Sequence, residues 1–370
     1  MAGIYIHIPF CASRCIYCGF YSTTELMLRQ RYVEAVVREM RMRCEKGMTI
    51  NTIYLGGGTP SQLTSFQLKT ILDAAYIYNK VENNAEITIE VNPDDITETF
   101  SHNLANLAVN RISMGVQTFN NERLHFLHRR HTAEQVTDAI NNLRKTGIQN
   151  ISIDLMYGFP GETMNEWETD IDKALALGVE HISAYCLMIE EGTPLYQFTI
   201  HNSQFTIDEE LERQMYELLI DKLNDAGYEH YEISNFAKPG FHSRHNSSYW
   251  DGTPYNGIGA AAHSYDIRTR SWNVADIRSY INAIEGGKRP FEEERIDDNT
   301  RYNDTITVAL RTREGINLQE LQTKYKDYCI QNASRFIEYG LLKNSRHHLS
   351  LTRKGLFVSD MIMSELMWVD

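Results

Sequence analysis

The sequence lacks any apolar run that could cross a membrane, since no stretch approaches the roughly 18 apolar residues that a spanning helix needs. The apolar segment from Ile4 has no basic leader before it and no small-residue cleavage site. Only six cysteines occur, and three of them stand alone at Cys44, Cys186 and Cys329. This number and placement do not suit a paired secreted framework, so we expect reduced thiols and a cytoplasmic protein.

The sequence also lacks an excess of basic residues. Its 36 lysines and arginines face 49 aspartates and glutamates, which gives a formal net charge of −13. Such a charge opposes binding to polyanions, so nucleic acid is not an expected partner. The 42% hydrophobic content over 370 residues is enough for a large core, and we expect one large domain with a smaller one.

Three cysteines close together are the most informative feature that is present. Cys11, Cys15 and Cys18 follow an apolar run, Ile4–Phe10, that reads as a buried strand. Phe20 stands where a fourth cysteine might follow. Thiolates suit zinc or iron-sulfur clusters, and three ligands leave one position of a four-iron cluster open. A three-cysteine catalytic zinc site and a chance grouping are the alternatives.

Short apolar runs alternate with amphipathic helical stretches from Ile4 to about Ile233, as expected of parallel βαβ units. Six such units predict a partial (β/α)6 barrel of the TIM type or an open sheet. The expected strands are Ile4–Pro9, Thr52–Leu55, Glu86–Val91, Arg111–Val116, Asn150–Met156 and His181–Met188. The expected helices are Leu28–Glu45, Thr64–Tyr78, Thr97–Ala108, Ala133–Thr146, Asn165–Leu177 and Asp208–Ala226.

Polar groups gather where these strands end, and that is where parallel α/β folds bind ligands. Gly56–Gly58 would let a ligand approach the backbone closely, while Glu90, Gln117 and Asp154 could bond ribose hydroxyls or an ammonium group. Arg129 could pair with a carboxylate. Each has a structural alternative: a glycine turn, a salt-bridged or buried carboxylate, and a solvated surface charge. Because such groups recur after successive strands, a ligand-binding site is favoured over these structural alternatives.

The motif CxxxCxxC, preceded by Tyr-x-His-x-Pro-Phe and followed by an aromatic residue, resembles the radical S-adenosylmethionine (SAM) enzymes. The resemblance implies a [4Fe-4S] cluster on Cys11, Cys15 and Cys18, with SAM chelating the fourth iron. It also implies SAM contacts, which fall on Tyr5, Tyr17, Gly57, Gly58, Thr59, Glu90, Gln117, Arg129 and Asp154.

Longer stretches resemble the oxygen-independent coproporphyrinogen III oxidase group and, within it, the HemW-type haem chaperones. They are Tyr5–Cys11, Gly56–Ser61, Glu90–Pro93, Arg111–Gln117, Ile153–Pro160 and Tyr231–Ala237. The oxidase pattern has a further cysteine where Phe20 stands here, and an amino-terminal arm that this chain does not show before its first strand. Both differences favour the chaperone branch.

The segment His245–Trp250 is similar to the HNxxYW motif that this branch links to haem binding. His245 could ligate haem iron while Tyr249 and Trp250 pack on the macrocycle. The alternative is a loop histidine with an ordinary hydrogen bond, whose two aromatic neighbours fill the core.

We expect three regions: a barrel with the cluster and SAM site over 1–235, a connecting region with the HNxxYW motif over 236–294, and a winged-helix-like domain over 295–370. The last region has eleven lysines and arginines against ten aspartates and glutamates. A nearly neutral module is a weak DNA binder, so a role in closing the barrel or contacting a protein is expected.

Two functions remain open from the sequence. The first is a chaperone that binds haem, a [4Fe-4S] cluster and SAM and delivers haem to a haem-dependent respiratory protein. The second is an enzyme that decarboxylates coproporphyrinogen III, and a nucleic-acid regulator is a more distant third. An unidentified electron donor is implied, and a homodimer or a transient contact with a membrane protein is compatible with the sequence.

Overall fold

The computed structural model describes residues 2–43, 48–201 and 208–369. Cys44 and the predicted end of the first helix at Glu45 lie outside these ranges. Within the ranges, no helix has both the length and the apolar character that a bilayer crossing requires.

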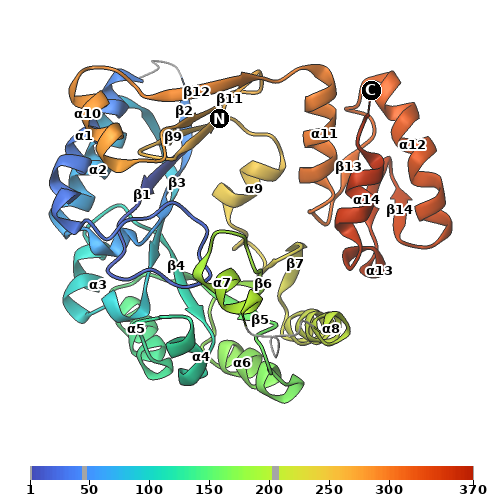
Figure 1. The fold of residues 1–370 in the computed structure, drawn as a ribbon, viewed down its shortest axis with the longest axis horizontal. Helices are drawn as coiled ribbons and strands as arrows, with labels where there is room; N and C mark the ends of the chain where they lie inside the picture. Colours follow the sequence, from blue (N-terminus) through green and yellow to red (C-terminus); the bar gives the residue numbers. More distant parts are fainter. Residues whose placement is uncertain (1, 44–47, 202–207, 370) are drawn as a thin grey trace.

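Six parallel strands form the centre of the molecule, and they follow one another in the sheet as they do in the sequence (Figure 1). They are β1 (Ala2–Ile8), β2 (Thr49–Gly57), β3 (Lys80–Val91), β4 (Arg111–Gln117), β5 (Asn150–Tyr157) and β6 (His181–Cys186). All six predicted strands are present. The largest difference is at β3, which begins at Lys80 rather than Glu86 because its first five residues are not buried and so lack an apolar pattern.

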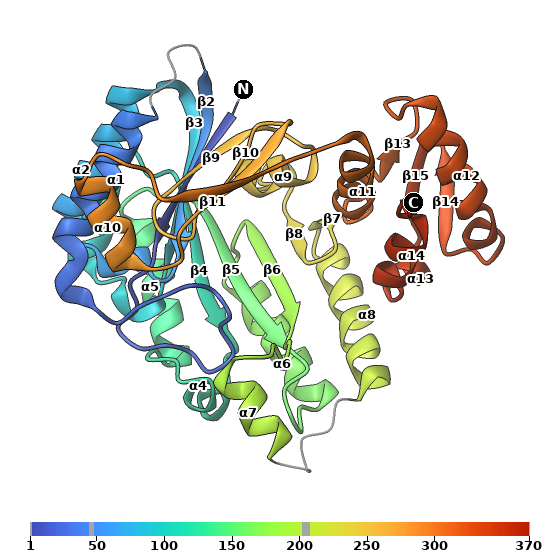
Figure 2. The ribbon, with the colours of Figure 1, turned by 45° about the horizontal axis from the view of Figure 1, so that its top comes forward.

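Five helices connect these strands, a sixth follows β6, and all six lie outside the sheet (Figures 1 and 2). They are α1 (Arg29–Met42), α2 (Ser65–Tyr78), α3 (Glu98–Ala105), α5 (Ala133–Lys145), α6 (Met164–Ala176) and α8 (Glu209–Asp225). Each was predicted within a few residues. Two shorter helices, α4 (Asn121–Phe126) and α7 (Pro194–Ile200), were not predicted and lie in the loops after β4 and β6.

The sheet continues on both sides of this parallel centre. Strands β8 (Asn235–Ala237) and β7 (Glu229–Glu232) extend it beyond β6. On the other side, β1 pairs with a strand from late in the chain, and the added strands are β9 (Tyr255–Ile258), β10 (His263–Tyr265), β11 (Thr269–Asn273) and β12 (Phe291–Arg295). In the part of the chain that the structure describes, β7 and β12 are not paired with each other. The barrel is therefore partial, as predicted, and the region 236–294 contributes strands to its sheet.

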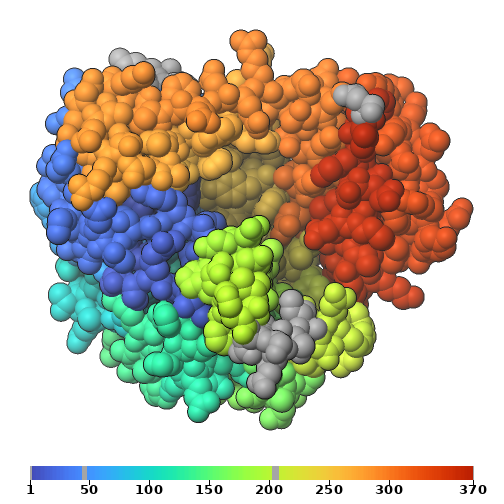
Figure 3. All heavy atoms as spheres, in the orientation of Figure 1, coloured from blue at the N-terminus to red at the C-terminus, as the bar shows by residue number. Residues whose placement is uncertain are grey.

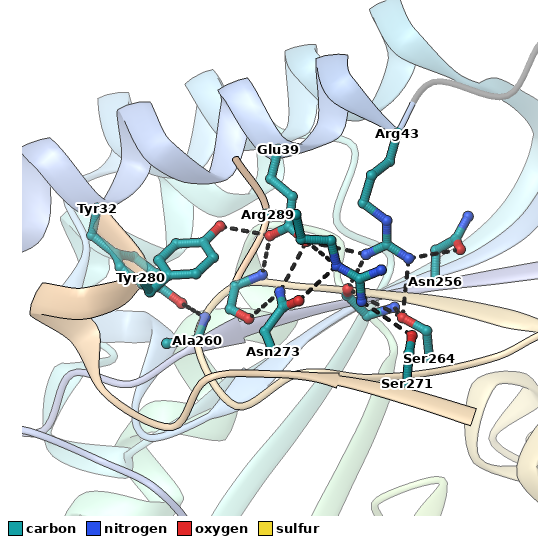
Figure 4. Close-up of polar contacts among 12 residues, drawn as sticks. Tyr32, Glu39, Arg43, Asn256, Ala260, Ser264, Ser271, Asn273, Tyr280 and Arg289 are labelled. Carbon is teal, nitrogen blue, oxygen red and sulfur yellow. Dashed lines mark hydrogen bonds and ion pairs between the residues drawn. The ribbon is translucent and has the colours of Figure 1, made fainter. Parts of the chain in front are cut away.

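A buried carboxylate joins these late strands to the first helix (Figure 4). Glu39 on α1 is fully buried and accepts hydrogen bonds from the Tyr280 hydroxyl at 2.6 Å and from Asn273 Nδ2 at 2.9 Å. Arg43 and Arg289 lie 3.1 Å and 3.5 Å from the same carboxylate. Because Tyr280 belongs to α10 (Ile277–Glu285), the network fixes a late helix against an early one.

The C-terminal region has a hydrophobic core of its own. Helices α11 (Asp298–Ala309), α12 (Thr323–Glu338), α13 (Arg353–Leu356) and α14 (Ser359–Leu366) surround the small sheet β13 (Ile316–Asn317), β15 (His348–Leu351) and β14 (Leu342–Ser345). Strands β14 and β15 pair as a hairpin, and α14 is the last helix of the described chain. Figures 1 and 2 show this region beside the open side of the main sheet.

Candidate functional site

A cavity of about 900 Å³ lies on the inner face of the central strands. Figure 3 shows the hollow, which is bordered by α7, by strands of the main sheet and by the C-terminal region. The predicted cluster, SAM and haem residues all line this cavity, whereas Gly56 at the start of the glycine loop does not. Successive side chains of a strand point to opposite faces of the sheet. Every second residue of each central strand can therefore face the cavity.

The cysteine loop is anchored at the mouth of the cavity by Ile16. This side chain is buried in a small apolar cluster that includes Leu127 and Leu195. Its backbone N–H donates to Leu127 O at 3.3 Å, and its carbonyl oxygen accepts from Leu195 N at 2.9 Å. The residue between Cys15 and Tyr17 thus packs inward, while the cysteines stay partly exposed to the cavity.

Polar groups surround two of the three sulfurs. The Thr59 hydroxyl donates to Cys11 Sγ at 3.6 Å, and Arg129 Nη1 donates to Cys15 Sγ at 3.5 Å. Burial raises the pKa of Cys11 and Cys18 in the ligand-free chain. A donor hydroxyl and a guanidinium both stabilise negative charge on sulfur, which is the form that binds metal.

The arrangement of the thiols distinguishes between the two metal sites considered above. Within the described residues, no three side chains of His, Cys, Asp or Glu converge closely enough to hold one metal ion. A zinc site needs its sulfurs about 2.3 Å from a shared ion. The cysteines of a four-iron cluster each bind a different iron and stand further apart. Three thiols facing one cavity therefore fit a cluster better than zinc.

The glycine loop packs too closely for side chains at its three glycines, and its role in the approach of a ligand stays a prediction. A Cβ on Gly57, where φ is +111°, would lie 2.4 Å from the His7 ring, and one on Gly58 would lie 2.7 Å from the Pro9 backbone. At Gly56 the Glu90 side chain fills the equivalent space, at 2.8 Å. The space that side chains at these glycines would need is thus filled by the β1 segment and by the Glu90 carboxylate.

Glu90 is held in one orientation by donors to both of its oxygens. The Tyr54 hydroxyl and the Gly57 N–H supply them. Burial nevertheless raises the pKa of Glu90 to about 7. Asp154 is similar, because burial raises its pKa to about 6 although Arg111 and Arg129 act in the opposite direction. Both carboxyl groups titrate near neutral pH and can accept or donate hydrogen bonds there.

Gln117 and Arg129 meet at one point of the cavity wall. Gln117 adopts a φ of +69° at an irregular step in the pairing of β4 with β5, which costs roughly 1–3 kcal/mol for a residue other than glycine. Arg129 donates to Gly115 O at 2.6 Å and to Asn92 Oδ1 at 2.8 Å. Its Nε is buried without a partner among the described residues. Arg129 is thus part of the cavity wall and not a solvated surface charge.

Two predicted tyrosines also line the cavity. Tyr5 on β1 lies near Tyr54, with ring centroids 6.1 Å apart, and its hydroxyl is 3.1 Å from His7 Nδ1. Tyr17 packs beside the cluster that buries Ile16, and burial raises its pKa. Both rings are neutral at physiological pH, so they can contribute apolar area and a hydroxyl donor.

His245 lies in the first turn of α9 (Arg244–Trp250), on the side of the helix that faces the core, and is fully buried. Its Nδ1 is 2.8 Å from Thr52 Oγ1, and its Nε2 is 2.9 Å from the Tyr249 hydroxyl. Burial lowers the pKa of His245 to about 3, and Arg111 adds to this effect. In this conformation the imidazole is neutral and both of its nitrogens have partners.

Several cavity residues were not predicted. Tyr54 supports Glu90, and Arg111 and Arg311 also line the cavity. Arg111 could have been found, because it shares a strand face with Gln117 when every second residue of β4 is counted. Arg311 gave no such signal, since it reaches the cavity from the C-terminal region.

Family models match two parts of the chain. The radical SAM superfamily model matches residues 5–174, and the HemN C-terminal domain model matches residues 296–358. The first range contains all the predicted cluster and SAM positions.

Three curated relatives share the name heme chaperone HemW. The protein of Lactococcus lactis is 36% identical over 99% of this chain and 97% of its own length. That of Bacillus subtilis is 34% identical over 96% of each chain. That of Mycobacterium tuberculosis is 31% identical over 99% of this chain and 94% of its own.

Among solved structures, the coproporphyrinogen III oxidase HemN from Escherichia coli, described as a radical SAM enzyme, superimposes with a TM-score of 0.87. The match covers 99% of this chain and 90% of that one at 21% identity. At this identity the likeness establishes the fold only. The curated relatives and the radical SAM model show that this chain belongs to the HemW family of radical SAM proteins.

Proposed function

We propose that this protein is a cytoplasmic haem chaperone that binds a [4Fe-4S] cluster through Cys11, Cys15 and Cys18, binds SAM beside it, and delivers haem to a haem-dependent respiratory protein. The observation that supports this most is that the three thiols and Arg129 face one cavity. The shared name of the curated relatives supports the haem-binding part.

The protein groups around the cluster position suit a sulfonium nucleotide. When bound, the cluster would supply an iron with an open coordination position and would accept one electron. Glu90, Gln117 and Asp154 would bond ribose hydroxyls or the ammonium group, and Arg129 would add positive charge near a carboxylate. Tyr5, Tyr17 and the backbone of Gly57, Gly58 and Thr59 would complete the enclosure.

Coordination of haem iron by His245 stays a prediction. In the conformation described, the Thr52 and Tyr249 hydroxyls occupy both ring nitrogens. Iron binding would therefore require the ring to break one of these hydrogen bonds. Tyr249 and Trp250 both line the cavity, so they are placed to contact a flat macrocycle.

The test is a haem titration of protein reconstituted without oxygen, with and without SAM, followed by absorption spectroscopy. We expect iron and sulfide in the reconstituted protein and a saturable haem spectrum. His245→Ala should weaken haem binding and alter the spectrum. Failure of the wild type to bind haem would exclude the chaperone function, and unchanged binding by the variant would exclude His245 as a ligand.

The second candidate is a radical SAM enzyme that decarboxylates coproporphyrinogen III. The observation in its favour is the cavity beside the cysteines, which leaves space for a guest. Phe20 lines this cavity with 71% of its surface exposed, where the oxidase pattern has a cysteine. Mass spectrometry of products decides between the two functions, because conversion of coproporphyrinogen III would replace the chaperone proposal.

A further inference from the structure

Arg111 is a buried cation in the wall of the cavity. It is the first residue of β4 and only 1% of its surface is exposed. Its Nε has no hydrogen-bond partner, and no residue that the structure describes forms an ion pair with its guanidinium. Because burial of an unpaired charge is unfavourable, such a residue calls for a compensating group.

Other arginines near the core do have such a group. Arg43 is paired with Glu39, Arg123 with Glu162, and Arg311 with Glu232. Arg111 differs from all three. Asp154 is close enough for Arg111 to lower its pKa, but the two side chains are not within ion-pair distance.

The place of Arg111 in the strand separates it from the cluster position. Arg111, Ser113, Gly115 and Gln117 all line the cavity from the same face of β4. Gln117, at the other end of the strand, is six residues away, which corresponds to about 20 Å. Arg111 therefore lies at the end of β4 that is distant from Gln117 and the cysteine loop, although it is near Asp154 among the proposed SAM contacts.

More polar atoms along this cavity have no partner among the described residues. They are Asn235 Oδ1 and Trp250 Nε1, and both residues line the cavity with Arg111. The neighbouring histidines do not compete for an anion, since burial lowers the pKa of both His181 and His245 and keeps them neutral. Arg311 also lines the cavity but is paired with Glu232, so Arg111 is the cation at this end of β4 that has no ion pair among the described residues.

We propose that Arg111 anchors a carboxylate of the guest, and that this carboxylate is a propionate of haem. The inference rests on the proposed function. A guanidinium fork matches a carboxylate in a bidentate pair, and haem has two such groups on one edge of its macrocycle. The other candidate, the SAM carboxylate, is expected beside the cysteines at the opposite end of β4.

The experiment compares haem with haem dimethyl ester, which has the same iron and macrocycle but no free carboxylate. Both are titrated into the full-length, cluster-loaded protein. We expect the wild type to bind haem about tenfold more tightly than the ester. Equal affinities in the wild type would overturn the proposal even if every variant misfolds.

Two substitutions assign the preference to Arg111. Arg111→Gln should reduce haem affinity about tenfold, leave ester affinity unchanged and thus remove the preference, whereas Arg111→Lys should retain part of it. Arg38→Gln, at an exposed position of α1 outside the cavity, is the control and should behave as the wild type. The melting temperature of ligand-free Arg111→Gln should not fall, because the substitution removes an unpaired buried charge.

The outcomes separate this inference from the function on which it rests. Absence of haem binding in the wild type would exclude the chaperone function itself. Haem binding with an unchanged preference in Arg111→Gln would overturn only the role of Arg111. Loss of SAM binding in that variant, with haem binding intact, would show that the carboxylate belongs to SAM and would also overturn the proposal.

Discussion

The Tyr54 hydroxyl donates a hydrogen bond to Glu90 Oε1 at 2.8 Å, which places a tyrosine of β2 against a carboxylate of β3. The Gly57 N–H donates to the other oxygen at 2.9 Å. Burial still raises the pKa of Glu90 to about 7, because the loss of hydration outweighs the two donors. The ligand-free site thus contains a carboxyl group that gains or loses its proton near neutral pH.

Glu90→Gln should change how stability depends on pH. Since the folded pKa of about 7 exceeds the ordinary value of 4.5, the folded state binds more protons between these values, and the Glu90 contribution to stability falls as pH rises from 4.5 to 7. Between pH 5 and pH 8, the free energy of unfolding of the ligand-free variant should rise by on the order of 2 kcal/mol relative to that of the wild type. Urea unfolding measures this change. Glu98→Gln, at an exposed position of α3, is the control. If the stability of Glu90→Gln and that of the wild type changed equally with pH, the prediction would be contradicted.

Single substitutions of Cys11, Cys15 or Cys18 by alanine should abolish stable cluster binding, because each thiol would hold a separate iron. Iron, acid-labile sulfide and visible absorbance after anaerobic reconstitution provide the measurement. Cys186→Ala is the matched control, since Cys186 lines the same cavity outside the loop and should retain the cluster. Full iron and sulfide in the triple alanine variant would refute the cluster assignment.

Glu39→Ala should destabilise the protein by about 3–5 kcal/mol, since it leaves Arg43 and Arg289 beside an empty, buried position. Chemical denaturation of the ligand-free protein measures the change. Glu34→Ala, on the exposed face of the same helix, should have an effect below about 1 kcal/mol. Equal stability of the two variants would show that the Glu39 network does not hold α10 in place.

His245→Ala should destabilise the ligand-free protein by about 2–4 kcal/mol, because it leaves a cavity and removes the partner of Thr52 and Tyr249. The pKa of His245 is lowered to about 3, so its contribution is present above pH 6.5 and is lost as pH falls toward 3. The difference between wild type and variant should therefore shrink on acidification. Thermal unfolding across pH tests this, with the exposed His102→Ala as the control; a constant difference would contradict it.

The sequence predicts the parallel centre of the fold well, because its strands are buried on both faces and appear as apolar runs. Strands β9 to β12 were not predicted, since they are short and in part fully exposed. Phe291–Arg295, for example, is exposed along its whole length and has three consecutive glutamates. Its partner in the sheet, β11, determines that it forms a strand.

The cavity-facing residues could be predicted because they follow from the ends of the strands, whereas their partners could not. The Thr52–His245 contact joins residues 193 positions apart, and no local pattern indicates it. The isolation of Arg111 is likewise a property of the assembled core. Sequence identifies which groups are present, but which of them neutralise each other depends on tertiary packing.

The pairing of β1 with β9 makes the order of synthesis relevant. Gly3–Ile6 pairs in parallel with Tyr255–Ile258, so a strand made first needs a neighbour made about 250 residues later. At roughly 5–20 residues per second, a ribosome takes about 10–50 s to add this segment. During translation the thiols just downstream of β1 lack a finished support, so the proposed cluster would be loaded after release of the completed chain.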